Sequence, residues 1–213
     1  MRKELTGSRS GSRSLGRLRE ATLRLLDERS PESITVTDIV TEAGVTRPTF
    51  YAAFGDLPTA FADAALSRLE EAFAGMTLTP AVPEAERSAA MEAAFLGILR
   101  RLEPHADFFA RALRGPGGIE VHVRAVDFLA TRLRESSPLS PDLARGPLSP
   151  GTASTSLAAG VVWTILVHLG EEDRRPVTEL APVLRDLVLH TVVGGLGRPA
   201  PSADPADPTP EES

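Results

Sequence analysis

Apolar residues recur at helical spacing along almost the whole chain. Near the N-terminus, a stripe at i, i+3, i+7, i+10 and i+11 is formed by Leu15, Leu18, Thr22, Leu25 and Leu26. Pro31 then ends this first helix, because its ring and its missing N–H do not fit a helix interior. No segment shows the two-residue alternation of a half-buried strand. The pattern therefore predicts an all-α protein.

The next segment carries the start and stop signals of two short helices joined by a tight turn. Thr35 is a predicted N-cap with Asp38 three residues later, a variant of the capping box. Gly44 is typical of the left-handed residue that follows a helix. Thr46 is a second predicted N-cap, and Pro48 fits the first turn of the helix that it opens. A helix-turn-helix is the expected unit.

The second short helix has distinct inner and outer sides. Phe50 and Phe54 stand at i and i+4, so both are expected to point into the core. Its ends and outer side are then covered by Arg47, Pro48, Thr49, Tyr51 and Ala52. A helix that lies in the DNA major groove needs this layout. The alternative is a three-helix bundle that binds nothing, which accounts for the two phenylalanines but not for the outward polar residues.

The remainder predicts a helical body. Asp56 caps a fourth helix, and a linker follows at Met76–Pro83. Further helices are expected through Met91, Phe95, Ile98 and Leu102, after Pro104, and over Gly118–Arg134, Ala153–Gly170 and Val177–Val193, with a loop at Glu135–Gly151. The helix over 118–134 is expected to bury Ile119, Val123, Val126, Ala130 and Leu133.

Length and local composition divide the chain into parts. Its 213 residues allow one or two domains. We expect a flexible basic arm (1–14), a three-helix head (15–60), a helical body (61–198) and a proline-rich disordered tail (199–213). The arm is rich in Ser and Gly and has no apolar segment, so we expect no secretory signal. The longest nearly apolar run, Leu157–Val167, is shorter than the roughly 20 residues of a membrane span.

Charge is distributed unevenly. The chain has a net charge of -6, yet residues 1–29 carry eight basic and four acidic side chains. A basic end on an acidic body fits a DNA-reading head, and a solvated tail is the alternative. The chain has no cysteine, which excludes disulfides and thiolate chemistry. Its four histidines form no helix-borne metal motif, so we expect no metal, cofactor or catalytic residue.

The stretch Ile34–Ala60, ITVTDIVTEAGVTRPTFYAAFGDLPTA, resembles the TetR family of bacterial transcription regulators. The resemblance extends over roughly Leu15–Ala72. It implies a DNA-binding set that comprises Thr35, Thr37, Thr46, Arg47, Pro48, Thr49, Tyr51 and Ala52. Arg47 and Pro48 correspond to base-reading positions, and Thr49 and Tyr51 to phosphate contacts.

This sequence departs from the family pattern in ways that remove backbone contacts. Ala52 and Ala53 replace larger residues, and Leu57 stands where a phosphate-binding lysine is usual. We expect Arg9 and Arg13 of the arm to compensate in the minor groove, with a solvated tail as the alternative.

The resemblance also implies a homodimer and an effector pocket in the body. The helix over 153–170 is apolar nearly all round, so either a partner or the core must cover it. We expect the dimer to form through Leu157–Leu169 and Leu180–Val192, with ordinary core packing as the alternative. The expected pocket is lined by Met91, Phe95, Phe108, His122, Val126 and Trp163, with His122 as the partner for an acidic group and core packing as the alternative.

The function predicted from these features is a cytoplasmic, dimeric repressor. It would bind a palindromic DNA operator and be released by a small hydrophobic or amphipathic ligand, with no membrane partner. A DNA-binding protein of the same fold under the control of a protein partner is the alternative. An enzyme is the least supported reading, because the sequence has no nucleophile–base set, phosphate-binding loop or metal motif.

Overall fold

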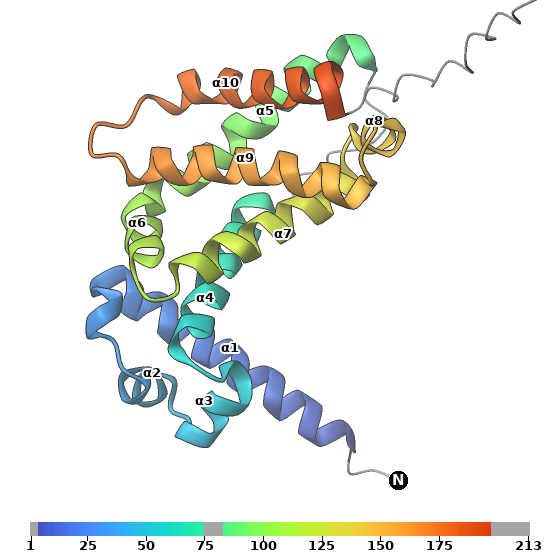
Figure 1. Ribbon diagram of the computed structural model, residues 1–213. Coiled ribbons are helices and arrows are strands. Elements are labelled where there is room, and N and C mark those ends of the chain that lie inside the picture. Colours follow the sequence, from blue (N-terminus) through green and yellow to red (C-terminus); the bar gives the residue numbers. More distant parts are fainter. Residues whose placement is uncertain (1–3, 75–82, 197–213) are drawn as a thin grey trace, which may run out of the picture.

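The computed structural model describes residues 4–74 and 83–196, and this part of the chain is all-α, as predicted. The head, at the bottom of Figure 1, holds α1 (Glu4–Glu28), the 3-10 turn η1 (Pro31–Ser33), α2 (Val36–Ala43) and α3 (Arg47–Phe54). Helix α4 (Leu57–Phe73) leads from the head to the body. Both predicted helix stops lie at glycines with positive φ, 60° at Gly44 and 78° at Gly55.

Helix α1 is longer than the sequence suggests. It begins at Glu4, so residues 4–14 are its first turns rather than the separate arm predicted for 1–14. Leu18, Ala21 and Leu26 are fully buried and fix the helix, and each further residue then adds a hydrogen bond at little cost. Arg13 is exposed on this extension. Residues 1–3, most of the predicted linker (75–82) and the tail (199–213) lie outside the described residues.

The body stacks the remaining helices above the head. It comprises α5 (Glu84–Leu102), the 3-10 turn η2 (Glu103–His105), α6 (Ala106–Arg114), α7 (Gly118–Ser136), α8 (Ser140–Arg145), α9 (Pro150–Gly170), α10 (Val177–Thr191) and the π-turn η3 (Val192–Leu196). Helix α9 packs on α7, and α10 packs on α5.

The expected loop Glu135–Gly151 instead contains α8. Leu139 and Leu143 are buried, and Arg87 Nη1 donates to Asp142 Oδ2 at 2.9 Å, which joins α8 to α5. These contacts order a segment whose prolines indicated a loop.

Helix α7 presents a different face to the core from the one predicted. Val126, Ala130 and Leu133 are buried as expected, but Ile119 is 84% exposed and Val123 is also exposed. Val121, Ala125 and Leu129 take the inner positions. The helix has two apolar stripes, and the packing against α4 and α9 decides which one is covered.

Helix α9 is divided between core and surface. Leu157, Val161, Ile165 and Leu169 are buried within the protomer, whereas Trp163 is 63% exposed. By length and composition alone α9 qualifies as a membrane span among the described helices, but half of its apolar window is buried inside the protein. A core helix with one uncovered apolar edge fits these observations.

Arginine side chains hold the head to the body. Arg68 of α4 donates to both carboxylate oxygens of Asp27, at 2.6 and 2.8 Å, and its guanidinium lies 4.1 Å above the Phe108 ring of α6. Arg111 of α6 donates to the carbonyl oxygens of Leu26 (3.0 Å) and Asp27 (2.9 Å) at the end of α1. The end of α1, the middle of α4 and α6 therefore meet at one junction.

Candidate nucleic-acid interface and internal cavity

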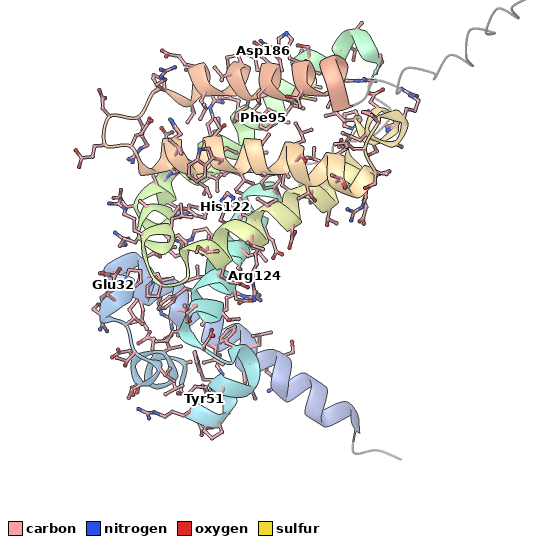
Figure 2. The ribbon with its side chains drawn as sticks, in the orientation of Figure 1. Glu32, Tyr51, Phe95, His122, Arg124 and Asp186 are labelled. Carbon is pink, nitrogen blue, oxygen red and sulfur yellow. The ribbon has the colours of Figure 1, made fainter. Side chains whose placement is uncertain are left out.

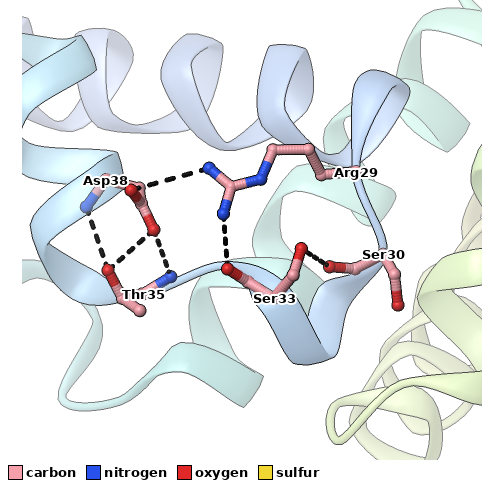
Figure 3. Close-up of polar contacts among 5 residues, drawn as sticks. All are labelled: Arg29, Ser30, Ser33, Thr35 and Asp38. Carbon is pink, nitrogen blue, oxygen red and sulfur yellow. Dashed lines mark hydrogen bonds and ion pairs between the residues drawn. The ribbon is translucent and has the colours of Figure 1, made fainter.

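A polar network fixes the start of α2 (Figure 3). The Asp38 N–H donates to Thr35 Oγ1 at 3.2 Å, and the Thr35 N–H donates to Asp38 Oδ2 at 2.8 Å, which completes the predicted capping box. Arg29 lies 3.5 Å from Asp38 and also donates to the Ser33 carbonyl. The hydrogen bonds from Thr35 are the main cause of the lowered pKa of Asp38. The carboxylate thus stays charged and holds the α2 N-terminus in place.

Helix α3 packs against the core of the head through its two phenylalanines. Phe50 is fully buried, Phe54 is nearly so, and their rings pack edge to face at 5.5 Å. On the opposite side Arg47, Pro48, Ala52 and Ala53 are exposed, and Tyr51 is 52% exposed, pointing away from the protein (Figure 2). Helix α3 therefore offers one free side for recognition of a partner.

The exposed side chains of α2 and α3 make contact across the turn. Arg47 Nη2 donates to Thr37 Oγ1 at 2.5 Å, which joins the first turns of the two helices. Thr46 occupies the N-cap position, but its side chain does not cap the helix and instead bonds Thr49 Oγ1 at 2.9 Å. Thr49 is half-buried, while the other seven predicted DNA-binding residues are exposed. The structure thus brings all eight predicted residues to α2, α3 and the turn between them.

A cavity of about 320 Å³ lies in the body along α5. Its walls are mainly apolar and come from α4, α5, α7, the segment after α7, α9 and α10. The lining includes Met91, Phe95, Leu129, Leu133, Leu139 and Val188. This volume lies at the lower end of the range for small-molecule sites, roughly 300–1,000 Å³.

A second hollow, of about 530 Å³, lies between α6, α7 and the end of α9. The His122 and Trp163 rings meet there edge to face, with centroids 6.0 Å apart. Its lining includes Ile119 and Val167, which are also exposed to solvent. The hollow therefore opens onto the solvent-exposed apolar side of α9.

The six predicted pocket residues do not share one cavity. Met91 and Phe95 line the cavity along α5, whereas His122 and Trp163 line the hollow beside α9. Phe108 and Val126 are buried side chains of the core. Met91 and Phe95 are separated from His122 and Trp163 because the His122 side chain lies on the side of α7 that faces away from α5.

Residues 18–56 match the sequence model of the family described as bacterial regulatory proteins, tetR family. This stretch of the chain is similar in sequence to the TetR family. The match covers α1 from Leu18, both short helices and the cap of α4, the part of the chain on which the sequence resemblance rested. No curated protein matches the chain in sequence.

Solved structures of TetR-family regulators share the fold of most of the chain. The repressor AlkX from Dietzia sp., implicated in biodegradation of n-alkanes, aligns with a TM-score of 0.56 at 18% identity over 84% of this chain and 95% of its own. FadR from Thermus thermophilus, a repressor solved with lauroyl-CoA, has a TM-score of 0.54 at 17% identity, over 93% and 100%. A regulator from Streptococcus agalactiae gives 0.51 at 19%, over 86% and 98%. At these levels of identity, the similarity is a similarity of fold.

Sequence reasoning missed Arg101 as a residue of the body cavity. Arg101 is an arginine in the lining of the α5 cavity. A signal was present, because Ala90, Ala94, Gly97 and Arg101 follow one another at i, i+4, i+7 and i+11 on one helix face. The scarce aromatic residues of the body pointed to a pocket beside His122 instead.

Proposed function

We propose that the protein is a dimeric transcription repressor of TetR type that binds a palindromic DNA operator. The exposed side of α3 over the buried Phe50 and Phe54 carries this proposal, because it presents Arg47 and Tyr51 on a rigid helix. The match of residues 18–56 to a family of regulatory proteins supports it. Such a regulator acts in the cytoplasm, where its operator lies, and needs no catalytic residue.

Arg47 is the proposed base reader. The chain contains no Asn or Gln for a bidentate contact with adenine, and Arg is suited to guanine O6 and N7. We therefore expect a guanine in each half-site whose replacement costs about 1–3 kcal/mol. In the free protein Thr37 holds the Arg47 guanidinium over the turn, so the arginine is partly ordered before it meets DNA.

Operator selection from random DNA tests this function. The wild type should enrich a palindrome with guanine in each half, and Arg47→Ala should lose the preference at that base. Arg24→Ala is a matched control, because Arg24 is an exposed arginine of the head that pairs with Glu42. Equal enrichment of one sequence by wild type and Arg47→Ala would show that Arg47 does not read a base. If the wild type enriches no sequence, the regulator proposal fails.

The proposed dimer interface is the outer face of α9 and α10. The exposed apolar side chains Trp163 and Val167 lie on α9, and Val183 and Leu187 lie on α10. Val161 and Leu184 lie in the same segments but are buried within the protomer, so only the outward residues of the predicted ranges can meet a partner. Val183→Glu with Leu187→Glu should give monomers in analytical ultracentrifugation and weaken operator binding. A dimer that persists in this variant would place the interface elsewhere.

The proposed effector is a small hydrophobic or amphipathic molecule in the α5 cavity. An apolar cavity with few polar groups is typical of such sites. The complex of FadR with lauroyl-CoA supports an amphipathic ligand for this fold. Release of DNA would require a ligand whose affinity differs between two orientations of the head.

A further inference from the structure

We propose that the α5 cavity selects an amphipathic acid, a molecule with an unbranched apolar chain and one carboxylate, and that Arg101 binds the carboxylate. This inference rests on the effector cavity of the proposed function. It adds the chemical class of the ligand, the residue that recognises it and the route by which the ligand reaches α4.

The shape of the cavity favours a chain. Its α5 wall runs from Ala90 to Arg101, a rise of roughly 16 Å along the helix at about 1.5 Å per residue. Small residues at Ala90, Ala94 and Gly97 open this wall, and a Cβ added at Gly97 would meet nothing within 4 Å. An apolar space that extends along α5 suits methylene groups, whose transfer out of water is favourable.

Charge is concentrated at one end of this space. Arg101 and Phe73 line the end nearest α4, whereas Ser137 and Leu139 lie toward the other end, near α8. The Ser137 hydroxyl already accepts the Leu139 N–H at 3.0 Å. Among the side chains that the structure describes, no carboxylate pairs with Arg101, whose hydrogen bonds go to backbone carbonyls. A guanidinium beside an apolar cavity is a site for a carboxylate, which it can bind through two parallel hydrogen bonds.

Arg101 also holds the end of α4. Its Nη1 donates to the Ala72 carbonyl at 3.0 Å and to the Ala74 carbonyl at 2.8 Å. Ala74 is the C-cap residue of α4, and α4 begins directly after the recognition helix α3. The guanidinium therefore touches both the cavity and the helix that carries the head.

A bound carboxylate would compete with these two carbonyls. The Ala72 and Ala74 carbonyls are neutral acceptors, whereas a carboxylate carries a full charge and can accept two parallel hydrogen bonds from the guanidinium, so a carboxylate would draw Arg101 toward the cavity. The end of α4 would then lose its donor. An uncharged ligand of the same length would fill the cavity but leave Arg101 on α4. The acid is thus the form that couples binding to the head.

Binding of dodecanoate and of 1-dodecanol to the full chain separates charge from chain length. Arg101 is exposed in the free protein, and an ion pair in contact with water contributes up to about 1 kcal/mol, so we expect the acid to bind about 2- to 5-fold more tightly than the alcohol. Arg101→Met keeps much of the apolar stem and should remove this preference. Arg101→Lys keeps the charge without the planar fork and should give an intermediate preference. Arg100→Met is the matched control, because Arg100 is exposed like Arg101 but does not line the cavity.

Two further readouts separate this inference from the proposed function. Gly97→Phe should block both ligands, because its ring would fill the open space beside Gly97 in the cavity wall. Fluorescence anisotropy of labelled operator should show release by dodecanoate from the wild type and from Arg100→Met, but not from Arg101→Met. If acid and alcohol bind equally, or if Arg101→Met and Arg101→Lys keep the full preference, Arg101 is not the acid site although the cavity binds ligand. If neither probe binds the wild type, the effector cavity itself is refuted.

Discussion

Replacement of Arg68 with Met tests how the head is joined to the body. The Arg68 side chain is only 12% exposed, pairs with Asp27 through two hydrogen bonds and stacks on Phe108. Met keeps most of the apolar stem and removes the charge. The change therefore isolates the ion pair and the cation–π contact.

The expected loss of folding free energy is about 2–3 kcal/mol. A half-buried charge-assisted hydrogen bond contributes about 1.5–3 kcal/mol, and a cation–π contact about 0.5–2 kcal/mol. Breaking a fully buried pair costs about 3–5 kcal/mol, but Asp27 is 43% exposed, and water can therefore solvate the carboxylate that is left behind. The melting temperature should fall by roughly 5–10 °C in a protein of this size.

The loss of stability in Arg68→Met is measured by thermal unfolding and compared with the loss in Arg24→Met, which removes a more exposed ion pair. Arg24 also joins α1 to a carboxylate, that of Glu42, at 2.9 Å, but both partners are about half exposed, so its loss should cost less than about 1 kcal/mol. Arg68 is the main cause of the lowered pKa of Asp27. The Arg68 contribution should therefore be complete above pH 3.8 and be lost as the pH falls through the lower folded-state pKa. Equal losses in the two variants at neutral pH would refute the reasoning.

Three other variants follow from local geometry. Gly97→Ala should raise stability by about 0.5–1 kcal/mol in thermal melts, since Ala loses less entropy in a helix and its Cβ meets open space. Gly118→Ala should lower stability by about 1–3 kcal/mol or more, because its Cβ would lie 1.9 Å from the Leu113 carbonyl oxygen, and Gly97→Ala is its control. Burial in the body lowers the pKa of His168. The neutral imidazole therefore costs no stability above pH 6.5, and the folded state loses stability as the pH falls below that value. His168→Leu should therefore flatten the stability profile between pH 7.5 and 5.5, and an unchanged slope would assign it to other groups such as His105, whose pKa burial also lowers.

The head was predictable because its determinants are local. Thr35 and Asp38 are three residues apart, Phe50 and Phe54 four, and Gly44 marks a left-handed turn by its own chemistry. Each signal acts within one or two turns of a helix, so the order of residues fixes the geometry. The sequence could not show that Thr46 turns to Thr49, because the capping bond and the side-chain bond use the same hydroxyl.

The body was less predictable because its contacts join distant segments. Helix α7 has two apolar stripes, and only the placement of α4 and α9 decides that Ile119 stays outside. The cavity was misassigned for a related reason. Aromatic residues such as Phe108 fill space, whereas the open space along α5 comes from small residues such as Ala94 and Gly97. A search for pocket residues by size therefore finds the core first.

Helix α4 is attached unequally along its length. Near its start, Asp63 receives two hydrogen bonds from Arg19 of α1, at 2.7 and 3.0 Å, and Arg68 then joins its middle to the end of α1. Its last carbonyls are held by Arg101 through bonds to neutral acceptors, which are weaker than those to carboxylates. The polar contacts at the end of α4 that borders the cavity are thus weaker than those at its middle. A ligand that draws Arg101 away should therefore reorient α1, α2, α3 and α4 together and leave the recognition surface itself intact.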